Sequence, residues 1–247
     1  MSLSEPGALF IGTSGFYYSQ WIGKFYPNNI PKTEWLTFYA RKFSSLEINS
    51  SFYRLPKEKT LKAWYEKTPS YFKFSLKASK YITHTKKLRN VKEDVESFVK
   101  LSSLLKEKLG VLLFQLPGSL RYNPLLLENF LSVLPKNYKY SIEFRDLSWF
   151  RKETYNILKK YKVSLCNISS PKIDNIFEVT TPFIYIRFHG IKRWYNYNYR
   201  QEDLVNWVKF VKNELLKGKD VYVYFNNDAS GYAIENAMYF KKLVEEE

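Results

Sequence analysis

The chain has a single cysteine, Cys166, among its 247 residues, and this scarcity excludes two classes of site. An intrachain disulfide needs two cysteines, and a zinc cluster built from cysteine ligands needs several. Histidine is nearly as rare, with only His84 and His189. The sequence also lacks the glycine spacing of a P-loop and the serine motif of a nucleophile elbow.

Long hydrophobic runs are missing too, because no stretch approaches the roughly 20 apolar residues that cross a bilayer. Residues 1–7 lack the basic and apolar regions of a signal peptide. We therefore expect a cytoplasmic protein without a membrane partner. No internal repeat, low-complexity segment or domain boundary is visible, and the length is close to the roughly 250 residues of one TIM barrel. The sequence predicts a single domain over residues 1–247.

Acidic residues are few, with 24 Asp and Glu against 39 Lys and Arg, which gives a formal net charge of +15. Most of the cations are lysines scattered along the chain. They fit a solvated basic surface, or a partner that is rich in phosphate. The charge does not decide between these interpretations, and nothing in the sequence indicates an oligomeric state.

Strand and helix patterns alternate along the whole chain. Apolar and polar side chains alternate with a period of two in residues 183–189, the pattern of a strand with two different faces. The other strands are predicted at residues 9–13, 46–50, 71–77, 111–116, 138–144, 163–167 and 221–227. Helices are predicted from about residue 31, around residues 61–65, from a capping box at Asn90 and Glu93 to Gly110, over 124–134, over 149–161 with Ser148 as the cap, over 204–215 and over 229–244. This order predicts a (β/α)₈ TIM barrel with a degenerate sixth helix.

Polar residues mark the carboxyl ends of the predicted strands, where the active sites of TIM barrels lie. The predicted catalytic residues are Glu47, Glu143, Arg145, Arg187 and His189, and we expect them to surround one cavity. The two glutamates could act as general acid and base, the arginines could stabilise negative charge, and His189 could move protons near neutral pH. The alternative is a satisfied ion-pair network that only fills the barrel.

Further polar residues at the same strand ends, or just after them, are predicted to bind substrate. They are Asn49, Lys77, His84, Gln115, Gly190, Lys192, Arg193, Trp194, Asn226 and Asn227. The loops after strands seven and eight often bind phosphate in this fold. Here they combine fixed charges, amides and the aromatic run 194–199, which could stack on a base or only brace the loop.

A divalent metal could be held by Glu47, Glu143 and His189, but three ligands on separate strands without local spacing are a weak signal. The two arginines would compete with a metal for the carboxylates. We expect no tightly held metal and no other cofactor.

Several motifs, in collinear order, resemble the YecE-like family, domain of unknown function 72. They are GTSGF at 12–16, EINSSFYRLP at 47–56, KAS at 77–79 with ITH at 82–84, FQLP at 114–117, EFR at 143–145, RFHG at 187–190 and FNN at 225–227. The resemblance implies a TIM barrel and does not imply a reaction. Where that family commonly has an aspartate at the end of the sixth strand, this chain has Cys166 and Asn167, which weakens a metal site or a carboxylate pair at that position.

Two functions follow from these observations. The first is an enzyme with a charged site at the barrel mouth that acts on an anionic, phosphate-bearing substrate, as a hydrolase or lyase of a phosphorylated or nucleic-acid substrate. The second is a nucleic-acid-binding protein that uses its basic and aromatic surface without catalysis. An inward ring of charge around a pocket would favour the first, and a flat basic patch away from the mouth would favour the second.

Overall fold

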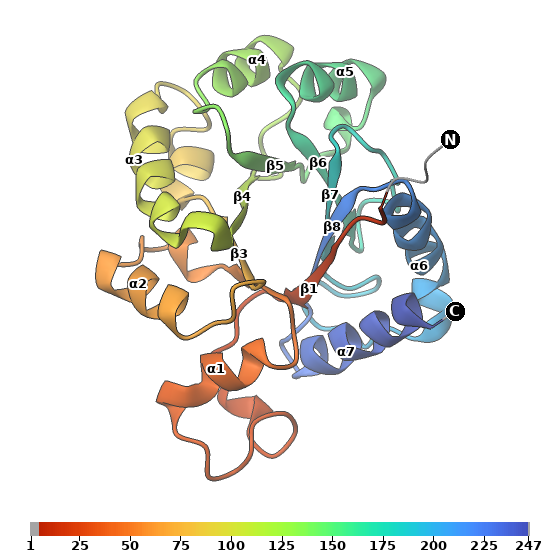
Figure 1. Ribbon diagram of the computed structural model, residues 1–247. Coiled ribbons are helices and arrows are strands. Elements are labelled where there is room, and N and C mark those ends of the chain that lie inside the picture. Colours follow the sequence, from red (N-terminus) through yellow and green to blue (C-terminus); the bar gives the residue numbers. More distant parts are fainter. Residues whose placement is uncertain (1–4, 247) are drawn as a thin grey trace. The chain divides into compact units, whose positions relative to one another are not determined.

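The computed structural model describes residues 5–246 and shows eight parallel strands alternating with helices (Figure 1). The strands are β1 Leu9–Thr13, β2 Ser45–Ile48, β3 Lys73–Lys77, β4 Leu109–Gln115, β5 Lys139–Glu143, β6 Ser164–Ser169, β7 Phe183–Phe188 and β8 Asp220–Phe225. The helices are α1 Trp35–Ala40, α2 Glu58–Glu66, α3 Lys92–Ser102, α4 Pro124–Ser132, α5 Lys152–Tyr161, α6 Gln201–Leu216 and α7 Tyr232–Glu245. The strand order in the sheet is β1-β8-β7-β6-β5-β4-β3-β2, the sequential order of a TIM barrel, so the predicted fold is confirmed.

The expected gap in the helix layer is also confirmed, because no helix of the described residues lies between β6 and β7. Within residues 5–246, no helix has the length and apolar character needed to span a bilayer. The prediction of a single domain stays a prediction. The chain divides into two compact units.

The first unit comprises Met1–Leu46, Asn167–Phe177 and Pro182–Glu247. In it β8 lies between β1 and β7, with Val223 in register with Ile11 on one side and Ile186 on the other. Helices α6 and α7 pack against these strands (Figure 1). The layers are joined by aromatic stacking, since the rings of Phe188 and Phe225 lie 4.4 Å apart, and both contact Phe240 of α7. This packing fixes the strand ends that carry the polar residues of this unit.

The second unit comprises Glu47–Cys166 and Glu178–Thr181. Strands β3, β4, β5 and the start of β6 pair side by side in it. Strand β4 is buried from its second residue to its last, as predicted for an apolar strand covered on both faces. Phe114 of β4 contacts Phe98 of α3 and Phe130 of α4, with ring centroids 6.1 and 5.0 Å apart. The apolar faces of these helices therefore hold the strands from outside.

Two predicted helix starts are wrong. Helix α3 begins at Lys92, and Asn90 is not its cap because its backbone is left-handed, with φ of 53°. Ser148 does not cap the fifth helix, since its hydroxyl accepts a hydrogen bond from the Tyr122 amide instead. Asp146 caps a short 3-10 turn there, and α5 starts only at Lys152. At Ser148 the short polar side chain satisfies a loop rather than the helix that follows.

Gly110 does not end the third helix. Helix α3 ends at Ser102, and Gly110 lies inside β4. A 3-10 segment, Ser103–Lys108, makes the connection. The left-handed backbone of Lys106, with φ of 49°, breaks the helix before the glycine is reached.

Candidate functional site

The carboxyl end of β5 carries a buried ion pair. Glu143, the last residue of β5, is fully buried, and its carboxylate accepts a hydrogen bond from Nε of Arg145. The thiol of Cys166 in β6 lies 3.8 Å from the second carboxylate oxygen, within reach to donate to it. A buried carboxylate needs such partners. The Arg145 side chain is 11% exposed, so the pair fixes a guanidinium where it still meets solvent.

Strands β3 and β4 contribute a second polar pair beside an aromatic ring. Lys77 ends β3, and its Nζ donates to Oε1 of Gln115 at 2.7 Å. The same Nζ lies 4.1 Å from the ring centroid of Phe52, a cation–π distance. Phe52 is nearly buried and therefore holds the ammonium group in a defined place.

His84 also contacts that ring. It belongs to a single turn of π-helix, Tyr81–Thr85, that follows β3, and its ring meets Phe52 edge to face at 5.0 Å. Its Nδ1 is 2.9 Å from Oγ1 of Thr83, and the described residues offer its Nε2 no hydrogen bond. π-Helical turns are rare and are frequent at functional sites.

The electrostatic environment of His84 is positive. Burial lowers the pKa of His84, and the neighbouring charges of Lys77, Lys80 and Arg145 lower it further, because each disfavours a second cation. Histidine has an ordinary pKa near 6.5. His84 is therefore mainly neutral at pH 7, with three cations close enough to influence it.

The segment after His84 has a strained backbone. Lys87, Leu88 and Asn90 all have positive φ, at 47°, 66° and 53°. A bulky residue such as Leu88 rarely adopts this conformation, and it persists here because the side chain is buried, with 3% exposed. Backbone strain of this kind clusters at ligand sites, at a cost of about 1–3 kcal/mol per residue.

In the first unit, the polar residues at the ends of β7 and β8 are buried. Arg187 and His189 are both fully buried. Nδ1 of His189 lies 3.3 Å from Nδ2 of Asn226, and its ring lies 5.5 Å from that of Trp194 and 5.7 Å from that of Tyr195. Three predicted residues therefore come together here, namely His189, Trp194 and Asn226.

Two groups that were predicted to bind phosphate also brace the loop after β7, and their role in binding stays a prediction. The Gly190 amide donates to the Tyr199 hydroxyl at 2.7 Å, and that hydroxyl reaches Ser169 at 2.8 Å. The Asn227 amide donates to the carbonyl of Tyr197 at 2.7 Å and is fully buried. Gly190 has φ of 106°, and a Cβ there would lie 2.3 Å from a backbone oxygen, so only glycine fits this turn. Lys192 and Arg193 are exposed on the loop.

The structure adds one acidic residue that the sequence reasoning missed. Asp228 follows β8 and is 8% exposed, and it accepts hydrogen bonds from Nε1 of Trp21 and Nε2 of Gln20, each at 3.0 Å. Burial raises its pKa to about 6 despite these donors. Its position after Phe225–Asn227, at the end of a predicted strand, was the signal that could have found it.

Two predicted residues remain, both near the end of β2 in the second unit. Glu47 is fully buried, and Asn49 is half-buried before a short 3-10 turn. That the five predicted catalytic residues surround one cavity stays a prediction. Residues 5–246 contain no group of three or more His, Cys, Asp or Glu side chains placed to hold a metal ion. The expected absence of a metal cofactor stays a prediction as well.

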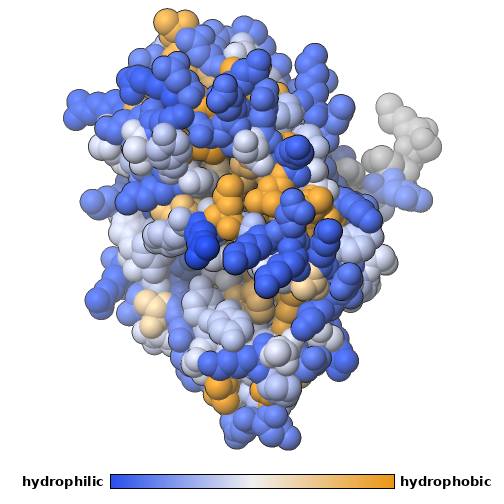
Figure 2. All heavy atoms as spheres, turned by 90° about the vertical axis from the view of Figure 1, so that its left-hand side faces the viewer, coloured by the Kyte–Doolittle hydropathy of each residue, from blue (hydrophilic) through white to orange (hydrophobic). Residues whose placement is uncertain are grey.

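The visible surface is mostly hydrophilic (Figure 2), as expected for a strongly charged chain. Figure 2 shows hydrophilic side chains over most of one face, with smaller hydrophobic patches between them. The formal net charge is +15.

Comparison with known proteins finds matches over nearly the whole chain. Residues 10–247 match the family model described as protein of unknown function DUF72. UPF0759 protein YunF of Bacillus subtilis is 25% identical over 96% of this chain and 95% of its own length. UPF0759 protein YecE of Escherichia coli is 34% identical over 46% of this chain and 42% of its own length.

Solved structures agree with these matches. A DUF72 family protein from Thermotoga maritima has a TM-score of 0.88 at 31% identity, over 97% of this chain and 100% of that chain. A DUF72 family protein from Enterococcus faecalis has a TM-score of 0.82 at 22% identity, over 97% of this chain and 96% of that chain. The second likeness shows the fold alone.

Proposed function

This chain belongs to the DUF72 family, and from its charged strand ends we propose that it is a TIM-barrel enzyme acting on an anionic, phosphate-bearing substrate. The reaction class that we propose is hydrolysis or elimination. The site that supports the proposal in the second unit consists of Lys77, His84, Glu143 and Arg145.

The observation that carries the proposal is the convergence of three cations on His84. Burial is the largest cause of its lowered pKa, and Lys77, Lys80 and Arg145 each lower it further. Glu143 balances one of these cations through its ion pair with Arg145. A phosphate group would supply the missing negative charge. Arg145 can meet it with planar donors and Lys77 with a point charge.

His84 is suited to transfer a proton to or from such a substrate. A neutral imidazole can accept a proton at pH 7, and a bound anion would raise its pKa again. Nδ1 is next to the Thr83 hydroxyl, which leaves Nε2 to face a ligand. Glu47, Arg187 and His189 remain proposed catalytic residues on the sequence argument alone.

The proposal can be tested by NMR titration of the two histidines. Their ring signals can be assigned with His84→Gln, because His189 is the only other histidine. We expect the pKa of His84 to lie below the ordinary value in chloride and to rise when phosphate is added at constant ionic strength. Lys77→Met should also raise it, because this variant removes one of the three cations.

Lys62→Met on the exposed face of α2 is the matched control, since it removes the same charge elsewhere in the second unit. It should leave the His84 titration unchanged. If the pKa of His84 does not change when phosphate is added, the proposal of an anionic substrate at this site is refuted.

Catalysis needs a separate assay. We expect a panel of phosphomonoesters and phosphodiesters to contain a substrate whose turnover falls at least about 100-fold in His84→Gln, the usual scale of general acid–base catalysis. A phosphate-dependent His84 titration without turnover of any panel member would count against an enzyme of this class.

Nucleic-acid binding without catalysis is the second candidate, and the net charge of +15 is compatible with it. The exposed Lys192 and Arg193, with the half-buried Trp194 beside them, would provide a basic and aromatic segment for it. Binding of a single-stranded oligonucleotide should then weaken steeply as salt rises.

A further inference from the structure

The second unit contains a cavity far from Glu143 along β5. It has a volume of about 640 Å³ and lies where α4 and α5 end and β5 begins. Glu143 is at the other end of β5, four residues from Lys139, which corresponds to roughly 13 Å of extended chain. We call this hollow the α4–α5 cavity. Its volume lies in the usual range of small-molecule sites, about 300–1,000 Å³.

Tyrosines and aliphatic groups form much of its lining. Tyr138, Tyr140 and Tyr161 contribute rings, and Leu131 and Leu134 contribute aliphatic side chains. The rings of Tyr138 and Tyr140 lie 6.4 Å apart, at 59° to each other. The Tyr140 hydroxyl donates to the carbonyl of Pro135 at 2.7 Å, which fixes that ring against the loop after α4. Such a lining suits a flat, partly apolar ligand.

The positive charge of the α4–α5 cavity comes from lysines. Lys136, Lys160 and Lys162 line the cavity, and none of its lining residues is a carboxylate. Lys160 lies 2.8 Å from Glu128, but that pair is exposed and contributes little. Lys160 Nζ also lies 5.2 Å from the Tyr161 ring centroid.

Lysines at helix carboxyl ends can balance the negative ends of the helix dipoles. Whether positive charge is left over depends on the sum of the lysines, the helix ends and Glu128. The ends of α4 and α5 supply roughly −0.5 each, and Glu128 supplies one further negative charge. Three lysines exceed this sum by about one positive charge. The cavity therefore keeps a net attraction for an anion after its internal partners are counted.

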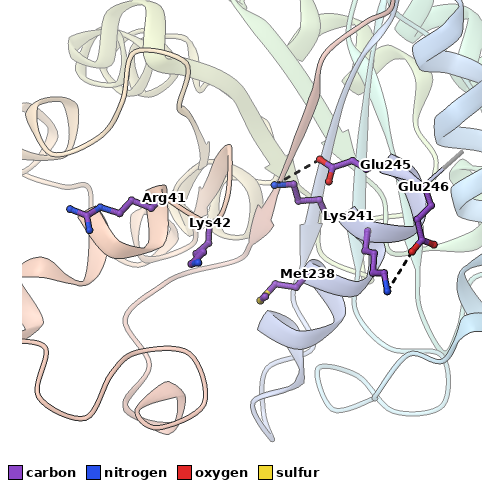
Figure 3. Close-up of a pocket in the computed structure, with 7 residues that line it drawn as sticks. Arg41, Lys42, Met238, Lys241, Glu245 and Glu246 are labelled. Carbon is purple, nitrogen blue, oxygen red and sulfur yellow. Dashed lines mark ion pairs between the residues drawn. The ribbon is translucent and has the colours of Figure 1, made fainter.

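A groove of the first unit is also basic but has a different lining. It lies between the end of α1, with Arg41 and Lys42, and the last turns of α7, and has a volume of about 470 Å³ (Figure 3). Lys241 and Lys242 there lie 3.8 and 3.4 Å from glutamates of their own helix, which also line the groove. The groove therefore contains two carboxylates, its large apolar side chain is a single methionine, and it offers no aromatic ring to a base. The groove therefore serves best as a control.

We propose that the α4–α5 cavity binds a nucleotide, with its base against the tyrosines and its phosphate at the lysines. A nucleotide combines the flat ring and the negative charge that this lining fits. The site is separate from the one around His84, and the proposal does not depend on catalysis there. The nucleotide can be free or part of a single strand.

The test is calorimetric titration of the whole protein with AMP, with UMP, with inorganic pyrophosphate and with a ten-nucleotide single-stranded RNA. Lys136→Ala with Lys162→Ala should weaken nucleotide binding by about tenfold or more, the usual effect of losing charged hydrogen bonds. Tyr138→Leu should weaken AMP binding and leave pyrophosphate binding unchanged, since it removes only the aromatic ring.

Arg41→Ala with Lys42→Ala is the matched control, because it removes two cations from another basic hollow of the chain. It should change nucleotide affinity less than about twofold. If AMP binds as tightly as the decamer, the ligand is a free nucleotide; if only the decamer binds and the lysine variant weakens it, the ligand is a strand. The proposal fails if neither binds, if the two double variants weaken binding equally, or if pyrophosphate binds as tightly as AMP.

Discussion

Asp228→Asn should change how the stability of the protein depends on pH. The Asp228 carboxylate is almost completely buried beside Trp21, and burial raises its pKa from 3.8 to about 6. The folded protein therefore holds this proton more tightly than the unfolded chain does. Stability is lost as pH rises between these two pKa values, because the folded state must then bury a charge.

The size of the effect follows from the shift. Each pKa unit corresponds to about 1.36 kcal/mol, so the shift of Asp228 corresponds to roughly 3 kcal/mol at pH well above 6. Between about pH 4.5 and 7.5 the expected loss is about 2 kcal/mol. Asparagine has no charge to bury, so the variant lacks this loss. Its hydrogen bonds to Trp21 and Gln20 will differ, but that difference does not vary with pH.

Urea unfolding of both proteins, measured from about pH 4.5 to 7.5, tests the argument. The free energy of unfolding of the parent, relative to Asp228→Asn, should fall by about 2 kcal/mol over that range. Asp174→Asn, which removes the same charge from an exposed site in the first unit, is the control. If the difference between parent and Asp228→Asn stays constant within about 0.5 kcal/mol, the carboxylate does not have the raised pKa.

Three further predictions concern the loop after β7 and the metal. Tyr199→Phe should lower the free energy of unfolding by about 1–3 kcal/mol, because it leaves the Gly190 amide without its acceptor, whereas Tyr195→Phe on the exposed part of the loop should have little effect. Arg193→Ala with Trp194→Ala should weaken oligonucleotide binding and reduce its salt dependence, as measured by fluorescence anisotropy; unchanged binding by a folded variant would exclude this loop. Elemental analysis of purified, untagged protein should show less than one equivalent of zinc, manganese or iron, and a full equivalent would contradict the expected absence of a metal.

Buried strands such as β4 were predictable because burial on both faces requires a continuous run of apolar residues, which is visible in the sequence. The strand predicted at residues 111–116 is observed as β4, Leu109–Gln115. A short, continuous apolar run of that length is typical of a strand buried on both faces. Helix starts were less predictable, because Ser148 and Asn90 can serve a loop as well as a helix. The choice at Ser148 depends on Tyr122, which is distant in sequence. Local patterns contain no information about such a partner.

The candidate site also has features that the sequence predicted and features that it did not. Strand parity placed Glu143 and Lys77 at strand ends, and both have the polar partners expected there. It could not show that Gly190 and Asn227 would be used by the loop, because Tyr199 and Tyr197 reach them only after the loop folds back. It also missed Asp228, since its environment depends on Trp21 at the other end of the chain.

The two ends of β5 explain why net charge alone could not identify a function. At its carboxyl end, Arg145 is paired with a buried glutamate, and at its amino end Lys136 and Lys162 line a cavity without a carboxylate. Positively charged side chains therefore serve different purposes at the two ends of β5, and their partners distinguish them. A chain with a formal charge of +15 can bind an anion wherever internal carboxylates fail to balance its lysines, so the number of such places matters more than the total charge. The α4–α5 cavity combines lysines and tyrosine rings in a lining without carboxylates, whereas the groove beside α7 has two glutamates and no aromatic ring in its lining.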